Sequence, residues 1–292
     1  MVYAFFAAGT ARKLAGSMLF ISLPETLLME PEVIGKAKET AFRAAREAGR
    51  ILKENFGKRY WVKDKPLQET LTELDLKAEE AIIGIIRKAF PGHSILAEES
   101  GHQESPGDYL WIIDPLDGTT NYSINNPFFC TSISLAYKGE VVLAVTSAPM
   151  SGELFHAIKG GGAFLNGKPI RVSKEGRISN LLLAYCNGKN PEDRVEIGRI
   201  FSRIKPVAKD FDRYKAGALE LAFVAAGRLG SYMANSQMSW DSAAGDLLVR
   251  EAGGRVTDFG GRPWSIHSSD IIASNGLIHE QLLGIIKEIR KG

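Results

Sequence analysis

The sequence has little cysteine and no cluster of histidines. Its two cysteines, Cys130 and Cys186, stand far apart and lack the short spacing of a thiolate metal site. The five histidines are scattered, so a zinc site with Cys and His ligands is not expected. No serine stands in a Gly-x-Ser-x-Gly segment, and the usual nucleophile of acyl hydrolases is therefore missing. Two isolated cysteines are typical of reduced thiols, and we expect a cytoplasmic protein.

The sequence also lacks a long apolar run and a strong excess of one charge. No stretch reaches the ~20 apolar residues that a transmembrane helix needs, so no membrane partner is expected. Lys and Arg total 36 against 34 for Asp and Glu, which gives a net charge of +2. The basic residues between positions 43 and 59 are not interleaved with aromatic side chains as in a nucleic-acid site. We interpret them as a solvated helix face and expect no nucleic-acid partner.

Residues 1–30 differ in composition from the rest of the chain. Two apolar runs flank Arg12 and Lys13, an order that only partly resembles a signal peptide, and no Ala-x-Ala site follows. We interpret this segment as an N-terminal extension, disordered or preceding a true start at Met18 or Met29. A targeting segment is the alternative.

From residue 31 onward, helical and strand patterns alternate, which predicts a mixed α/β (α+β) fold. We expect an N-terminal half at 31–176, which carries most metal ligands, and a C-terminal half at 177–292. Helices are expected at 32–56, 73–89, 191–203, 216–228, 240–252 and 277–289. Strands are expected at 93–97, 110–113, successively through 128–172, and at 181–185, 231–233, 255–259 and 270–274. Residues 58–70 are irregular and are interpreted as a loop or a hairpin near the site.

Acidic residues occur where these elements begin or end. Asp114 and Asp117 follow the buried run at 110–113, and Glu98 follows the strand before it. Buried carboxylates are costly unless a cation or hydrogen bonds compensate them. Asp75 and Asp241 stand at helix starts, where an acid can also simply complement the helix dipole. Together these five acids predict a site for Mg²⁺, which prefers hard oxygen ligands.

Beside Asp117 lies the segment Gly118-Thr119-Thr120, which predicts a turn into a helix. The free N–H groups of a helix start bind anions, and glycine permits a close approach of the backbone. A cation site beside such a cradle suits phosphate hydrolysis by a metal-activated water. The hydroxyl of Thr119, backed by Asp75, could orient that water.

Three segments together resemble the inositol monophosphatase family: Asp-Pro-Leu-Asp-Gly-Thr-Thr-Asn at 114–121, Ala-Glu-Glu-Ser at 97–100, and the Trp-Asp-Ser-Ala-Ala-Gly to Glu-Ala-Gly-Gly stretch at 240–254. The resemblance runs from about residue 32 to the C-terminus. It implies a layered αβαβα sandwich and a lithium-sensitive, Mg²⁺-dependent phosphatase, usually a homodimer. The implied substrate is a small phosphorylated molecule, a polyol or sugar phosphate.

The resemblance also implies roles for individual residues. Two or three Mg²⁺ ions would be held by Glu98, Asp114, the carbonyl of Leu116, Asp117 and Asp241. Catalysis would involve Asp75, Glu98 and Thr119. Phosphate and substrate would be bound by Asp117, Gly118, Thr119, Thr120, Lys189, Arg213, Lys215 and Asp241.

The sequence departs from the family on the substrate side. Inositol-preferring members carry an acid seven residues before the equivalent of Asp241, and here that position is Ala234. Lys189, Arg213 and Lys215 could bind a second phosphate, or could be ordinary surface residues. The alternatives are therefore a fructose-1,6-bisphosphatase or dual-specificity sugar phosphatase and, from another class, a non-catalytic regulatory or binding protein with the same fold.

Overall fold

The computed structural model describes residues 31–65 and 69–291. The expectations for residues 1–30 lie outside these ranges. Within them, none of the helices combines the length and apolar character needed to cross a bilayer.

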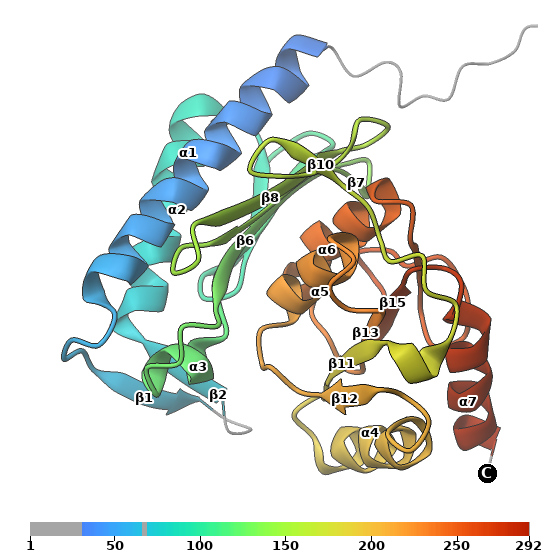
Figure 1. The fold of residues 1–292 in the computed structure, drawn as a ribbon. Coiled ribbons are helices and arrows are strands. Elements are labelled where there is room, and N and C mark those ends of the chain that lie inside the picture. Colours follow the sequence, from blue (N-terminus) through green and yellow to red (C-terminus); the bar gives the residue numbers. More distant parts are fainter. Residues whose placement is uncertain (1–30, 66–68, 292) are drawn as a thin grey trace, which may run out of the picture.

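The N-terminal part of the molecule is an eight-stranded sheet covered on one face by two helices (Figure 1). The strand order is β10-β9-β8-β7-β6-β5-β3-β4, and only the β3–β5 pair within it is parallel. The helices are α1 (Pro31–Asn55) and α2 (Glu73–Ala89), and the strands are β3 (Ser94–Ala97), β4 (Gly101–Gln103), β5 (Tyr109–Asp117), β6 (Cys130–Tyr137), β7 (Glu140–Ala148), β8 (Glu153–Ile158), β9 (Gly162–Leu165) and β10 (Lys168–Ile170).

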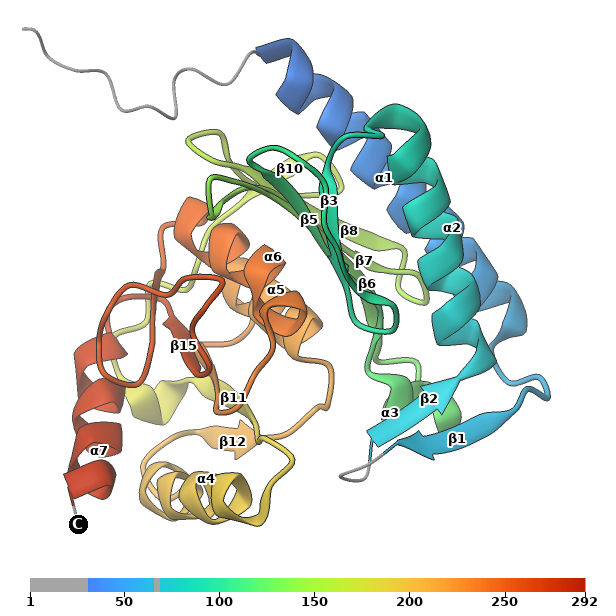
Figure 2. The same ribbon diagram turned by 180° about the vertical axis from the view of Figure 1, so that it is seen from behind.

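The C-terminal part contains a five-stranded sheet of order β12-β11-β13-β15-β14. Helices α5 and α6 fill the space between the two sheets, and α4 and α7 cover the far face (Figures 1 and 2). The elements are a short 3₁₀ turn (Ile178–Asn180), β11 (Leu182–Cys186), α4 (Pro191–Ile204), β12 (Asp210–Asp212), α5 (Gly217–Ala225), β13 (Ser231–Ala234), α6 (Ser239–Glu251), β14 (Arg255–Thr257), β15 (Ile271–Ser274) and α7 (His279–Lys291). The five layers confirm the predicted αβαβα sandwich.

The outer helix layer follows directly from the apolar spacing of α1. Ala37, Ala41, Ala44, Ala48 and Leu52 recur at three- or four-residue intervals and are fully buried. Small side chains on this stripe let α1 lie close to α2 and to the sheet. The predicted helices at 32–56 and 73–89 are thus confirmed to within a residue at each end.

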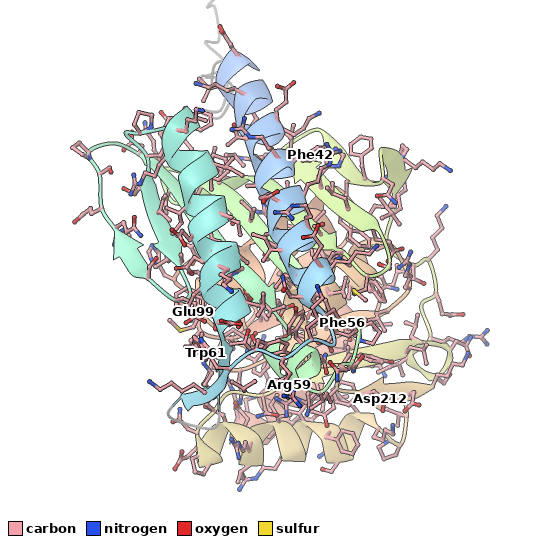
Figure 3. The ribbon with its side chains drawn as sticks, turned by 90° about the vertical axis from the view of Figure 1, so that its left-hand side faces the viewer. Phe42, Phe56, Arg59, Trp61, Glu99 and Asp212 are labelled. Carbon is pink, nitrogen blue, oxygen red and sulfur yellow. The ribbon has the colours of Figure 1, made fainter. Side chains whose placement is uncertain are left out.

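Several expectations at element boundaries needed correction. The short strands β4 and β12 were not predicted, and three-residue strands leave too little pattern to detect. The helix expected at 216–228 is shorter, because α5 ends at Ala225. Of the two alternatives for residues 58–70, the hairpin is confirmed, because β1 (Val62–Lys65) pairs antiparallel with β2 (Glu69–Thr72), which continues past position 70 to Thr72; residues 66–68 lie outside the described residues. Figure 3 shows Trp61, at the start of this hairpin, beyond the end of α1 marked by Phe56.

Strand β5 carries an irregularity that decides the geometry of the site. Asp114 pairs with Ser132 and Asp117 pairs with Cys130, so three steps on β5 match two steps on β6. Residues two apart on a strand face the same side, whereas residues three apart normally face opposite sides. The extra residue of this β-bulge therefore turns Asp114 and Asp117 toward the same side of the sheet.

Candidate active site

All of the predicted site residues except Asp75 line one cavity of about 500 Å³. It lies between the large sheet, the starts of α5 and α6, and the loop after β11. The acidic residues and the segments beside them contribute Glu98, Asp114, Leu116, Asp117, Gly118, Thr119, Thr120 and Asp241. Basic residues contribute Lys189, Arg194, Arg213 and Lys215. The cavity therefore has both an acidic and a basic part of its lining.

Glu98 and Asp114 are neighbours because β3 and β5 run parallel in adjacent positions. Ala97 pairs with Ile113, and the amide of Glu98 donates to the carbonyl of Ile113 at 3.2 Å. Glu98 and Asp114 thus lie side by side at the point where β3 ends, although β5 itself continues past the expected 110–113 to Asp117. Burial raises the pKa of Asp114 well above its usual value, and the nearby charges of Glu98, Asp117 and Asp241 raise it further.

Asp117 is held from the other side by the start of α5. Its Oδ2 accepts the amides of Ala218 at 2.8 Å and Leu219 at 3.4 Å, more than one hundred residues away in sequence. Burial and the charge of Asp241 nevertheless raise the pKa of Asp117 to about 7. This contact between β5 and the start of α5 was not predicted, because no local sequence pattern links residues so far apart.

Asp241 reaches the cavity from the first turn of α6. Its Oδ2 accepts the amide of Met238 at 2.9 Å, which caps the helix. Burial raises its pKa to about 6, an effect that the Met238 amide and the charge of Lys189 partly offset.

The donor set fits a hard divalent cation. Oxygen atoms of four carboxylates face one cavity, and three of those carboxylates have raised pKa values that a cation would reverse. Within 31–65 and 69–291, no three acidic, histidine or cysteine side chains form a ready-made cage. Mg²⁺ does not need such a cage, because it commonly binds through one or two carboxylates together with waters and substrate phosphates.

Asp75 does not line the cavity but reaches it through Thr119. Its Oδ2 accepts the amide of Thr72 at 2.8 Å and the hydroxyl of Thr72 at 2.5 Å, which closes the capping box of α2. Its Oδ1 accepts the hydroxyl of Thr119 at 2.9 Å. The same hydroxyl lies 2.9 Å from the carbonyl of Leu116, so its single proton is held on the protein side. The lone pairs of the Thr119 oxygen are therefore available to a water.

Gly118 meets a strict conformational requirement at the cradle. Its φ of +95° lies in the left-handed region, and an added Cβ would lie 3.1 Å from the carbonyl oxygen of Phe128 and 3.2 Å from the Cβ of Ala216. Helix α3 (Thr119–Ser123) begins immediately afterwards, as predicted. The segment is anchored by Asn121, whose amide donates to the carbonyls of Phe128 and Tyr214, both at 2.7 Å.

The substrate side of the cavity is only partly as expected. Lys189, Arg213 and Lys215 do line it, whereas Ala234 is fully buried in β13 and does not. Sequence reasoning missed several other lining residues: Cys186, Asn187, Gly188, Arg194, Gly217, Tyr232, Ser236, Gln237 and Trp240. Of these residues, Trp240 opens the 240–254 segment that resembles the family, although no site role was expected for it. Two lining residues other than glycine, Lys215 and Ser236, adopt positive φ values of 64° and 50°, a strain that clusters at functional sites.

Fold and cavity together define a layered αβαβα sandwich with an acidic cavity at the junction of its layers, and comparison with known proteins gives the family. The model of the inositol monophosphatase family matches residues 36–291, and the chain belongs to this family. It is 38% identical over 255 residues to "Nus factor SuhB" of Pseudomonas aeruginosa, covering 85% of this chain and 94% of the relative. It is 36% identical over 250 residues to "Fructose-1,6-bisphosphatase/inositol-1-monophosphatase" of Thermotoga maritima, covering 85% and 95%.

Solved structures agree with this assignment. The extragenic suppressor protein SuhB of Bartonella henselae superposes with a TM-score of 0.83 at 34% identity, covering 86% of this chain and 98% of that one. An inositol monophosphatase of Thermotoga maritima superposes with a TM-score of 0.81 at 34% identity, covering 87% and 98%. The family and fold expected from the sequence are confirmed.

Proposed function

We propose that this protein is a Mg²⁺-dependent phosphomonoesterase that hydrolyses a small polyol or sugar phosphate of the inositol 1-phosphate type. The observation that carries the proposal is the convergence of Glu98, Asp114, Asp117 and Asp241 on one cavity with the Gly118–Thr119 segment. The family membership agrees with this activity. A cytoplasmic homodimer is part of the proposal and follows from the family resemblance.

In the proposed site, the carboxylates of Glu98, Asp114, Asp117 and Asp241 and the carbonyl of Leu116 would hold two or three Mg²⁺ ions. Bound Mg²⁺ would polarise the phosphoryl oxygens and lower the pKa of the attacking water. Side chains and backbone amides of the chain itself would orient the water and bind the phosphate.

The hydroxyl oxygen of Thr119 accepts a hydrogen bond from the attacking water, while its proton is donated in a hydrogen bond to Asp75. This arrangement orients the water. The amides of Gly118 and Thr119, with Thr120 alongside, receive the phosphate oxygens. Positioning and charge stabilisation of this kind supply most of the catalysis in phosphoryl transfer. Water attacks phosphorus in line while the bond from phosphorus to the ester oxygen breaks. The water loses a proton and the leaving oxygen takes one up, so that inorganic phosphate and the alcohol are released and the chain forms no covalent bond with phosphorus.

The basic part of the lining favours a substrate with a further anionic group. Lys189, Arg213 and Lys215 face the same cavity as the phosphate cradle, and Arg194 joins them. The charge of Lys189 lowers the pKa of Asp241, so Lys189 lies close to the acidic part of the lining. A sugar bisphosphate, such as fructose 1,6-bisphosphate, is therefore the alternative substrate.

A second candidate function is that of a regulatory or binding protein with the same fold. It is favoured by the name "Nus factor SuhB", which several relatives bear and which states no enzymatic activity. The complete acidic set argues for turnover, because a protein that only binds has no need to bury carboxylates together.

Phosphate release separates the two candidates. The protein should release phosphate from one or more of inositol 1-phosphate, fructose 1,6-bisphosphate and glucose 1-phosphate with Mg²⁺, and release none with EDTA. Asp114→Asn should abolish turnover and keep the fold, as circular dichroism would show. Release that persists in EDTA, or an Asp114→Asn variant with near wild-type rates, would show that the metal mechanism is wrong. No release from the whole panel would favour the binding protein.

A further inference from the structure

Two loops of the cavity wall are joined by one buried side chain, Asn235. It directly follows Ala234, the position at which the resemblance led us to expect an acid, and it is only 2% exposed. One loop contains Gly188 and Lys189, after β11, and the other contains Ser236 and Gln237, after β13. All four of these residues line the cavity. Asn235 itself lies behind them.

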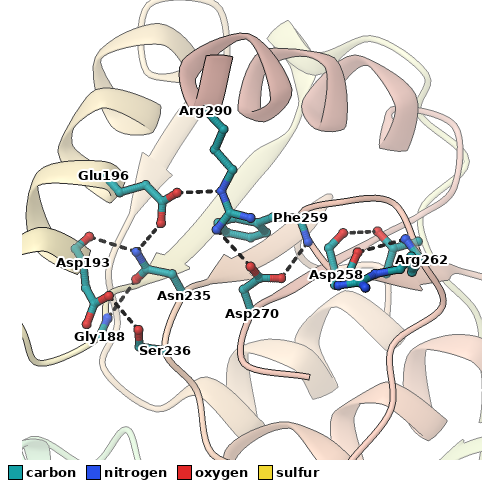
Figure 4. Close-up of polar contacts among 11 residues, drawn as sticks. Gly188, Asp193, Glu196, Asn235, Ser236, Asp258, Phe259, Arg262, Asp270 and Arg290 are labelled. Atoms are coloured by element: carbon teal, nitrogen blue, oxygen red, sulfur yellow. Dashed lines mark hydrogen bonds and ion pairs between the residues drawn. The ribbon is translucent and has the colours of Figure 1, made fainter. Parts of the chain in front are cut away.

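Asn235 satisfies its polar atoms across the two loops and α4 (Figure 4). Its Oδ1 accepts the amide of Gly188 at 2.9 Å. Its Nδ2 donates to the carbonyl of Asp193 at 3.0 Å and to Oε2 of Glu196 at 2.7 Å. Three hydrogen bonds to three different residues leave this amide little rotational freedom, so it fixes the Gly188 backbone relative to β13 and α4.

The same two loops are also joined through Asp193. Its Oδ1 accepts the hydroxyl of Ser236 at 2.6 Å, and its Oδ2 accepts the amide of Asn190 at 3.2 Å. The loops pack so closely that a Cβ on Gly188 would lie 2.4 Å from both Asp193 Oδ2 and Ser236 Cβ. The positive φ of Ser236 is held by this contact.

Arg290 in α7 supports the hydrogen bond between Asn235 and Glu196. Oε1 of Glu196 accepts Nε of Arg290 in α7 at 2.7 Å, and the same guanidinium donates to Asp270 at 2.9 Å. Arg290 also lies over the ring of Phe259, 4.8 Å from its centroid (Figure 4). Glu196 is thereby kept in place as the acceptor for Asn235.

We propose that Asn235 is the positioning residue that sets substrate specificity in this cavity, by fixing the distance between the Lys189 loop and the Gln237 loop. It touches no reacting atom, and the phosphate cradle and the carboxylates lie on other elements. Its loss should therefore weaken the binding of the part of the substrate that does not react. This inference rests on the proposed phosphatase function and goes beyond it.

The kinetic test compares Asn235→Ala with Asn275→Ala. Asn275 is a matched control, because it is also buried, also makes three hydrogen bonds, and does not line the cavity. With Mg²⁺ and the better of inositol 1-phosphate and fructose 1,6-bisphosphate, Asn235→Ala should raise KM about tenfold, roughly the loss of one net hydrogen bond. Its kcat and its inhibition by inorganic phosphate should stay close to wild type. Equal KM changes in both variants, or a loss confined to kcat, would overturn the proposal.

A second variant pair tests the hydrogen-bond pattern itself. Asn235→Asp should raise KM as well, because it places a carboxylate oxygen against Glu196. Adding Glu196→Gln restores a donor opposite that oxygen, and the double variant should recover part of the wild-type KM, since the carboxylate still faces the carbonyl of Asp193. A double variant no better than Asn235→Asp alone would contradict the assigned role.

Amide exchange keeps the inference separate from the proposed function. Hydrogen–deuterium exchange at Gly188 should be markedly faster in Asn235→Ala than in wild type, and unchanged in Asn275→Ala. Wild-type protein that releases no phosphate would refute the proposed function, while exchange at Gly188 would still test whether Asn235 fixes the Gly188 backbone. Unchanged exchange at Gly188 would refute the positioning role of Asn235, whether or not the protein releases phosphate.

Discussion

Replacing Asp75 by Asn separates a structural role from a catalytic one. Asp75 is fully buried and accepts hydrogen bonds from Thr72 on one oxygen and from Thr119 on the other. Asn has the same shape but only one acceptor oxygen, so one of the two sides must lose its partner.

The structural loss should be small. Removal of one side of a capping box costs ~1 kcal/mol, and a domain of this kind has roughly 5–15 kcal/mol of stability. Nearly all of the variant should therefore remain folded. The catalytic loss should be larger, because a positioned proton acceptor contributes roughly 10²–10⁴-fold to a rate. We expect kcat to fall by about that factor, with KM changed by less than about threefold.

The assay is steady-state phosphate release at saturating Mg²⁺, beside urea unfolding of the same samples. Thr119→Val should lose activity to a similar degree, whereas Thr119→Ser, which keeps the hydroxyl, should retain much of it. An Asp75→Asn enzyme with kcat within threefold of wild type would refute this reasoning. So would a Thr119→Val enzyme that stays fully active, because the water would then be oriented elsewhere.

Two further predictions concern the cradle and the second sheet. Gly118→Ala should lower stability by about 1–3 kcal/mol in thermal or urea unfolding and reduce phosphate affinity, because its φ is +95° and its Cβ would meet Phe128; an unchanged inhibition constant for inorganic phosphate would count against the cradle. His279 is fully buried, and burial lowers its pKa from 6.5 to about 4. Between pH 4 and pH 6.5, only the unfolded chain binds a proton at His279. The free energy of unfolding should therefore be highest above pH 6.5 and fall by up to ~3 kcal/mol toward pH 4. In urea titrations, His279→Gln should show a shallower loss, and an equal loss would contradict the assignment.

The parts of the fold predicted from sequence are those with a local signal. Helix α2 was placed correctly because its apolar spacing is local and because Pro91 and Gly92, which do not favour a helix, follow shortly after its end at Ala89. The acids at strand ends were also recognisable, because a carboxylate after a buried run has no packing reason to be there. Their convergence on one cavity was therefore foreseeable from strand topology.

The remainder depends on contacts between distant segments. The bond from Ala218 to Asp117 joins residues more than one hundred positions apart, and no periodic pattern encodes it. Asn235 gave no signal either, because a single Asn after a strand ordinarily predicts a turn. Its meaning depends on Gly188 and Glu196, which only the folded chain brings to it.

The bulge in β5 makes the site sensitive to chain length in a way that few other places in the protein are. Asp114 and Asp117 face the same side only because one extra residue lies between them. A surface loop can usually gain or lose a residue, since its ends can adjust. Here the insertion of one residue beside Thr131 in β6 would keep every acidic residue in the sequence, but three steps on β6 would then match the three steps on β5. The protein would retain its full set of carboxylates and lose the common direction of Asp114 and Asp117, so the pairing of these two strands is as much a functional requirement as the identity of their residues.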